Sequence, residues 1–120
     1  YEAFCGAEPE APAPDPINIS VAELAELQAQ GDGPKLLDVR TPREWQVSRL
    51  EGAELLPLQQ LPQRWQEIDP DTEIVVYCHH GHRSARAVEF LRRAGLTRVR
   101  NLTGGIDAWS REIDPAVPLY

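Results

Sequence analysis

The chain has only two cysteines, and it has no hydrophobic run of the length that spans a membrane. It also lacks the basic and then apolar segment of a secretory signal. Cys5 lies in a proline-rich lead, whereas Cys78 directly follows an apolar run, so the two do not resemble a disulfide framework. We therefore expect a protein of the reducing cytoplasm that is not anchored in a membrane.

Positive charge is also scarce, because 12 lysines and arginines face 19 acidic residues and leave a net charge of −7. This balance argues against nucleic acid or an anionic membrane as a partner. The cations between positions 79 and 100 nevertheless form a dense group: His79, His80, His82, Arg83, Arg86, Arg92, Arg93, Arg98 and Arg100. The protein is acidic overall, but this segment is basic.

The length of 120 residues, with 42% hydrophobic and 26% charged residues, indicates one domain with a real core. Residues 1–17 carry prolines between small and acidic residues, a composition that cannot pack a core. We predict that they are a linker from an upstream domain and that residues 18–120 form the folded domain. A chain that begins with Tyr1 is also expected to be a fragment or a processed form.

Strand and helix patterns alternate along the chain. Apolar runs predict strands at residues 35–39, 53–56, 73–77 and 99–102. Helical spacing predicts helices at 21–30, from 42, at 58–68 with an early interruption at Pro62, at 84–94 and around Trp109. This alternation indicates an α/β domain whose sheet is mainly parallel and carries helices on both faces. Sites in such sheets form at the carboxyl ends of strands, and Cys78 falls at such an end.

The residues after the third strand carry the chemistry: Cys78, His79, His80, Gly81, His82, Arg83 and Ser84. A thiol between a strand and a helix faces the backbone N–H groups at the helix start, which favour a thiolate. Gly81 permits the positive φ that a tight loop needs. Arg83 either braces the loop or meets an anionic substrate. We expect the three histidines to point outward as a positive collar around a nucleophile and an anion nest.

The loop also allows other interpretations. A cysteine after a buried strand can be an inert core thiol. Cys78 and the histidines could bind zinc, but ligands packed into one turn rarely converge tetrahedrally, so we expect no metal and no cofactor. A non-catalytic binding module on the same fold commonly lacks the cysteine. Trp45, Trp65 and Trp109 are expected to anchor the core.

A phosphatase or arsenate reductase also places a cysteine and an arginine around an anion nest. Its loop usually has five residues between the two, whereas four separate Cys78 from Arg83 here. The smaller cradle should suit a single sulfur atom.

Four motifs of this chain resemble those of rhodanese-homology domains. The loop at residues 78–84 is similar to Cys-x-x-Gly-x-Arg-Ser/Thr, and residues 37–40 with 44–45, 52–58 and 104–109 are similar to that family's Asp-Val-Arg…Glu-Tyr/Trp, Gly-Ala…Pro-Leu and Gly-Gly…Ala-Trp. Residues 48–51 depart from the family's usual Gly-His-Ile-Pro. The resemblance implies a rhodanese-like fold with a five-stranded sheet, and a sulfurtransferase that carries a persulfide on Cys78.

The resemblance also gives roles to residues outside the loop. Asp38 and Arg40, at the end of a neighbouring strand, are expected to support the loop. Glu44 stands four positions after Arg40 on a predicted helical turn, and we expect these two to form an ion pair.

The two ends of the chain, residues 1–6 and 113–120, are similar to fused adenylyltransferase–sulfurtransferases of the MoeB/MoeZ type. This similarity implies a covalently linked upstream adenylation domain. Sulfur would come from thiosulfate or from the persulfide of a cysteine desulfurase. It would pass to the activated C-terminus of a ubiquitin-like sulfur carrier protein, for molybdopterin, thiamine or tRNA thiolation. A stand-alone thiosulfate:cyanide sulfurtransferase remains the alternative.

Overall fold

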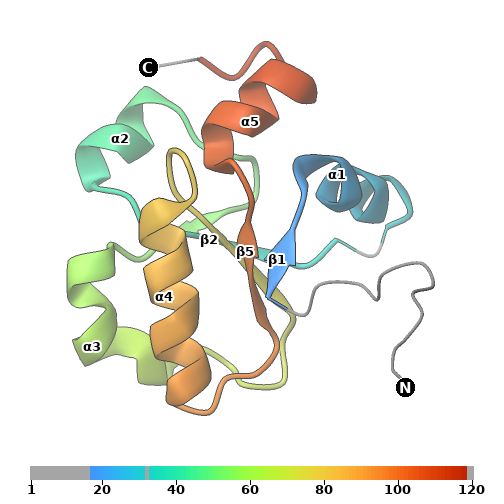
Figure 1. The fold of residues 1–120 in the computed structure, drawn as a ribbon. Coiled ribbons are helices and arrows are strands. Elements are labelled where there is room, and N and C mark those ends of the chain that lie inside the picture. Colours follow the sequence, from blue (N-terminus) through green and yellow to red (C-terminus); the bar gives the residue numbers. More distant parts are fainter. Residues whose placement is uncertain (1–16, 32, 119–120) are drawn as a thin grey trace, which may run out of the picture.

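The computed structural model describes residues 17–31 and 33–118 (Figure 1). Its five strands form one sheet in the order β1-β5-β4-β2-β3, with every pair of neighbours parallel. The strands are β1 (Asn18–Ile19), β2 (Lys35–Asp38), β3 (Glu54–Leu55), β4 (Ile74–Tyr77) and β5 (Val99–Leu102). The predicted parallel α/β sheet is confirmed, and the four strands expected from apolar runs lie where they were predicted. β1 was not predicted, because two residues show no periodicity.

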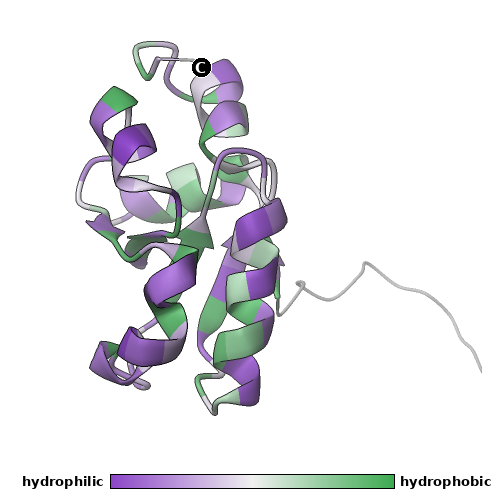
Figure 2. Cartoon of the chain, turned by 90° about the vertical axis from the view of Figure 1, so that its left-hand side faces the viewer, coloured by the Kyte–Doolittle hydropathy of each residue, from purple (hydrophilic) through white to green (hydrophobic). Residues whose placement is uncertain are grey.

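Helices cover both faces of this sheet, as predicted. They are α1 (Val21–Ala29), α2 (Pro42–Val47), α3 (Leu61–Arg64), α4 (His82–Arg93) and α5 (Gly105–Glu112). One core joins alternate residues of β4, such as Val76, to α3 and α4. The other core joins Val75 and Tyr77 to α1 and α5. Figure 2 shows hydrophobic and hydrophilic residues alternating along the helices, as expected for helices with one face on the sheet.

Two helix boundaries differ from the prediction. The expected helix at 58–68 is divided into the 3-10 turn η1 (Leu58–Gln60), α3, and the 3-10 turn η2 (Trp65–Glu67). Pro62 has no N–H to donate to the preceding turn, so it is accommodated in the first turn of a new helix. The second difference is that α4 begins at His82 instead of Ser84, because Gly81 is its N-cap.

The tryptophans divide between core and surface. Trp109 is buried between α1, α5 and the sheet, and Trp65 packs against the opposite core. Trp45 is only half-buried, and its ring lies 4.8 Å from the guanidinium carbon of Arg49, so its prediction as a core anchor was wrong.

None of the helices in the described part of the chain has the length and apolar character that crossing a membrane requires. The predicted linker, apart from residue 17, lies outside the described residues, as does Cys5. The same holds for residues 119–120 of the C-terminal motif.

Candidate active site

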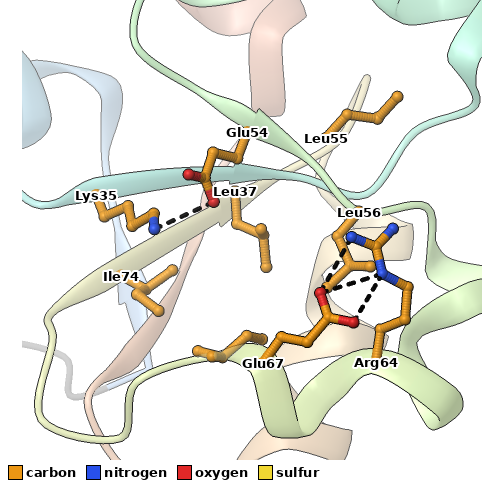
Figure 3. A pocket seen from close by; sticks show the side chains of 9 residues that line it. Lys35, Leu37, Glu54, Leu55, Leu56, Arg64, Glu67 and Ile74 are labelled. Carbon is orange, nitrogen blue, oxygen red and sulfur yellow. Dashed lines mark hydrogen bonds and ion pairs between the residues drawn. The ribbon is translucent and has the colours of Figure 1, made fainter.

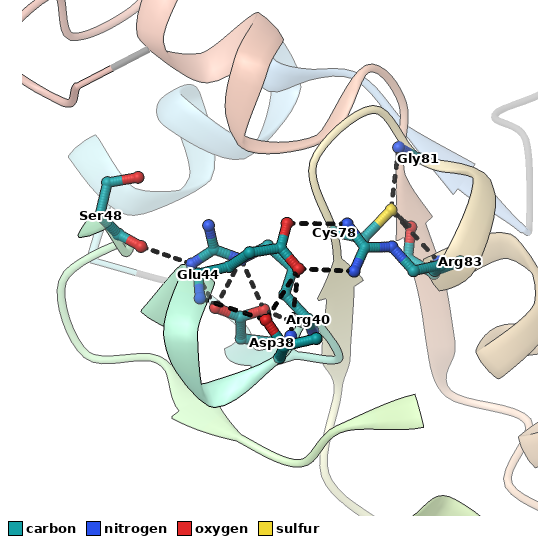
Figure 4. A network of polar contacts seen from close by, with 9 residues as sticks. Asp38, Arg40, Glu44, Ser48, Cys78, Gly81 and Arg83 are labelled. Carbon is teal, nitrogen blue, oxygen red and sulfur yellow. Dashed lines mark hydrogen bonds and ion pairs between the residues drawn. The ribbon is translucent and has the colours of Figure 1, made fainter. Parts of the chain in front are cut away.

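Cys78 directly follows β4, and its sulfur is surrounded by hydrogen-bond donors (Figure 4). The Gly81 N–H donates to Sγ at 3.0 Å, and the N–H and hydroxyl of Ser84 both lie 3.4 Å from it. The residue is a free cysteine that is only 1% exposed. Three donors that converge on one sulfur at the start of a helix stabilise negative charge there. The donors of this loop therefore converge on the sulfur itself.

The loop holds this shape because two glycines let neighbouring backbone approach closely. Gly81 has φ 103°, and a Cβ there would lie 3.3 Å from the Gly104 nitrogen. A Cβ on Gly105 would overlap the carbonyls of Cys78 and His79. Those two carbonyls accept hydrogen bonds from the N–H groups of residues 106 and 107, at 2.9 and 3.0 Å. The first turn of α5 thus holds the loop in place, and this close approach explains the second glycine of the Gly104-Gly105 motif.

Ser84 links the sulfur to a buried amide that was not predicted as a site residue. Its hydroxyl lies 2.5 Å from Oδ1 of Asn101, on β5. Nδ2 of Asn101 donates to Oδ1 of Asn18, on β1, at 3.2 Å. The only signal in the sequence was a polar residue inside an apolar strand, and nothing in it indicated that Ser84 would lie opposite.

Arg83 forms a two-pronged ion pair with Glu44 of α2. Its two terminal nitrogens lie 2.7 and 2.9 Å from the two carboxylate oxygens. The expected partner of Glu44 was Arg40, and that prediction was wrong. Spacing along one helix suggested it, but the fold turns the carboxylate toward a residue 39 positions away. Of the two expectations for Arg83, this geometry favours bracing of the loop.

Asp38 and Arg40 form a fully buried ion pair beneath the site. Nε of Arg40 lies 2.9 Å from both Asp38 oxygens, and one terminal nitrogen donates to the backbone carbonyl of Ser48. The guanidinium lies 5.5 Å from the ring of Tyr77, the residue before Cys78. Burial, together with the charge of Asp38, raises the pKa of Tyr77 above its ordinary value. The ion pair therefore supports the loop indirectly, because it packs against the Tyr77 ring directly before Cys78.

The three histidines do not form the uniform collar that was expected. His80 and His82 are exposed, but the His79 side chain is only 19% exposed. Burial lowers the pKa of His79, and the neighbouring His80, whose ring stacks on it at 4.1 Å, adds to this effect. Nε2 of each of these two histidines lies 3.9 Å from a carboxylate oxygen of Asp107. Asp107 therefore places a negative charge beside the two rings.

His79, His80 and Asp107 are also the residues that could hold a metal ion, with ligand atoms within 4.8 Å of one another. The set differs from the one considered in the sequence, because the Cys78 sulfur is turned into the loop. The separations of 3.9 Å exceed the roughly 3.4 Å between ligands of one tetrahedral ion. The hydrogen bond from Arg111 also lowers the pKa of Asp107 and occupies one of its oxygens.

A separate cleft lies at the amino ends of β2 and β4, the opposite end of the sheet from Cys78 (Figure 3). Its charged groups already form pairs: Lys35 with Glu54 and Arg64 with Glu67, each at 3.1 Å. None of the described residues that line it belongs to the loop at 78–84. This cleft is therefore separate from Cys78 and its hydrogen-bond donors.

Comparisons with known proteins agree with this geometry. The family described as "Rhodanese-like domain" matches residues 20–112. The chain is 35% identical to the "Probable adenylyltransferase/sulfurtransferase MoeZ" of Mycobacterium tuberculosis, over 100% of this chain and 32% of that protein. It is 38% identical to a "Sulfurtransferase" of Allochromatium vinosum, over 82% of this chain and 92% of that protein.

Among solved structures, the chain is similar to a rhodanese-related protein from Thermoplasma volcanium. The TM-score is 0.75 at 34% identity, covering 87% of this chain and 99% of that chain. The five-stranded fold expected from the motifs is thereby confirmed. The chain spans about a third of the length of the MoeZ protein it matches.

Proposed function

Because the chain belongs to the rhodanese-like domain family, that of rhodanese-type sulfurtransferases, we propose that Cys78 carries sulfur as a persulfide. The observation that carries this proposal is the convergence of three donors, from Gly81 and Ser84, on the Cys78 sulfur. Such donors stabilise a thiolate before the reaction. They are also placed to stabilise the charge on sulfur during transfer.

The reaction consists of two exchanges at sulfur. The Cys78 thiolate attacks the sulfane sulfur of a donor, and a new S–S bond forms while the bond to the leaving group breaks. The leaving group departs with its electron pair, as sulfite from thiosulfate or as a thiolate from a persulfide. With a nucleophilic acceptor such as cyanide, the acceptor then attacks the outer sulfur, the S–S bond breaks, and Cys78 leaves as the thiolate. No net oxidant or reductant is needed in the first exchange.

The alternative of a cysteine-based phosphatase has less support. That chemistry needs an arginine fork on the oxyanion in the loop. Here both prongs of Arg83 point to Glu44, and the nearest donors sit directly on the sulfur. These contacts favour a site for one sulfur atom.

The similarity to MoeZ supports a narrower proposal for donor and acceptor. We propose that this domain follows an adenylation domain in a longer cytoplasmic protein. It would take sulfur from thiosulfate or a cysteine desulfurase persulfide. The outer sulfur would then attack the activated C-terminal carbonyl of a ubiquitin-like sulfur carrier and displace the activating group. A thiol would reduce the S–S bond to Cys78 and so release the carrier with the added sulfur. The second candidate is a stand-alone thiosulfate:cyanide sulfurtransferase. It is favoured by the Allochromatium protein, because the match covers 92% of that protein.

The test is the intact mass of the protein after incubation with thiosulfate, with and without a reductant. We expect a gain of one sulfur that the reductant removes, in the wild type and in Cys5→Ser, and no gain in Cys78→Ser. Release of thiocyanate on adding cyanide would measure transfer onward. No gain of sulfur, together with turnover of an aryl phosphate, would contradict the proposal and favour the phosphatase.

A further inference from the structure

The hydroxyl of Ser84 lies between two acceptors. Its oxygen is 2.5 Å from Oδ1 of Asn101 and 3.4 Å from Sγ of Cys78, and Ser84 is fully buried. A serine hydroxyl has one proton to donate. The amide oxygen and the sulfur therefore compete for the same hydrogen bond.

The orientation of the Asn101 amide follows from its other contact. Nδ2 donates to Asn18 on the neighbouring strand, which leaves Oδ1 as the atom that faces Ser84. Asn18 and Asn101 are paired in the register of β1 and β5. Nδ2 also lies 3.9 Å from where a Cβ of Gly81 would be, so the amide packs beneath the loop. Asn101 is 7% exposed.

The balance between the two acceptors depends on the charge of the sulfur. A neutral thiol is a weak acceptor, so the hydroxyl donates its hydrogen bond to the amide oxygen of Asn101. A thiolate accepts a charge-assisted hydrogen bond, which is roughly twice as strong as a neutral one. The hydroxyl can then turn from the amide oxygen and donate to the sulfur. The serine is thus a donor to sulfur mainly when the sulfur is charged.

We infer that Asn101 is a positioning residue of this site, which acts through Ser84 and sets how strongly the serine hydroxyl donates to the Cys78 sulfur. The inference rests on the proposed function, because it concerns the thiolate that attacks the donor. Asn101 holds the hydroxyl oxygen within reach of the sulfur and accepts its hydrogen bond when the sulfur is neutral.

Two substitutions at Asn101 should change the reactivity of Cys78 in opposite directions. Asn101→Asp has nearly the same shape, but its carboxylate retains the hydroxyl proton and adds negative charge. Asn101→Leu removes the competing acceptor, so the hydroxyl donates to the thiolate. The readout is the rate of iodoacetamide alkylation against pH, followed by the mass of the peptide that holds Cys78.

We expect the pH midpoint of alkylation to move up in Asn101→Asp, with about tenfold slower alkylation at neutral pH. In Asn101→Leu the midpoint should move down. Thr103→Val, an exposed position just after β5, is the control and should leave the midpoint unchanged. General damage to the site would move both Asn101 variants in the same direction, and that result would overturn the inference.

The same Asn101 substitutions in a Ser84→Ala variant test whether Asn101 acts through Ser84. In Ser84→Ala the downward shift from Asn101→Leu should vanish, because no hydroxyl remains to redirect. A shift of the same size in that background would overturn the inference. Should Asn101→Leu not fold, the near-isosteric Asp variant decides alone, since an unchanged midpoint contradicts the mechanism.

The failure of this inference can be told from failure of the proposed function. A wild type that alkylates at Cys78 but gains no sulfur from any donor would remove the proposed function. If the wild type gains sulfur and both Asn101 variants keep the wild-type pH midpoint of alkylation, only the proposed role of Asn101 is refuted.

Discussion

Replacing Gly105 by alanine should damage both the stability of the domain and the shape of its active-site loop. A Cβ at this position would overlap the backbone carbonyls of Cys78 and His79. These are the carbonyls that accept hydrogen bonds from the first turn of α5. The helix and the loop cannot both keep their places around an added methyl group.

The size of the effect has two parts. The φ of +63° lies in the left-handed region, where an L-residue costs about 1–2 kcal/mol. Overpacking against backbone adds about 1–3 kcal/mol, so the free energy of unfolding should fall by about 2–5 kcal/mol. A domain of this size has roughly 5–15 kcal/mol in total, so the loss is a large fraction.

Gly52→Ala is the matched control. Gly52 has a similar φ of +82°, but a Cβ there would meet nothing within 4 Å. This variant should lose only the backbone part, about 1–2 kcal/mol. The difference between the two variants isolates the contact between α5 and the loop.

Urea unfolding at equilibrium would measure both variants, with the slope m checked for constancy. The mass-based uptake of sulfur from thiosulfate would be followed in the same samples under native conditions. We expect the Gly105 variant to take up sulfur ~10- to 100-fold more slowly, because a displaced loop misplaces its donors. Equal losses of stability in the two variants, or sulfur uptake at the wild-type rate in Gly105→Ala, would refute this reasoning.

Three further substitutions test the surroundings of the loop. Glu44→Gln keeps a helix-capping side chain but removes the charge that holds Arg83. Sulfur uptake should slow several-fold, while the free energy of unfolding in urea changes by about 1 kcal/mol or less. Unchanged uptake would contradict a bracing role for Arg83. Asp38→Asn leaves the buried Arg40 charge without its carboxylate and should cost about 3–5 kcal/mol of unfolding free energy, and a loss below 1 kcal/mol would argue against the buried pair. The pKa of the Tyr77 phenol is raised in the folded protein. Above pH ~10 the unfolded chain therefore releases the phenolic proton while the folded chain keeps it, so the free energy of unfolding falls as pH rises. Thermal unfolding between about pH 9 and 11 should therefore be flatter in Tyr77→Phe than in the wild type, and parallel curves would contradict it.

The elements around the nucleophile could be predicted because their signals are local. The apolar run of β4, the glycine at the turn and the helical spacing of α4 follow one another in the sequence. The start of α1 is likewise decided locally, because Ser20 and Glu23 form a capping box in which both hydrogen bonds are present. In each case the residues that decide the structure lie within a few positions of one another.

The rest of the site could not be predicted, because it depends on contacts between distant segments. Spacing along a helix suggested Glu44 as the partner of Arg40, but the parallel sheet brings α2 beside the start of α4, where Glu44 meets Arg83. Asn101 reaches Ser84 only because β5 lies next to β4. Asp107 meets His79 because α5 packs against the loop.

The most direct test of the persulfide on Cys78 is a crystal structure of the protein after treatment with thiosulfate, with anomalous scattering used to locate sulfur. Our account predicts one additional sulfur bonded to Sγ of Cys78, within hydrogen-bond reach of the N–H groups of the loop. An unmodified Cys78 with sulfur gained only at Cys5, or a tetrahedral oxyanion bound in the loop without a bond to Sγ, would contradict it.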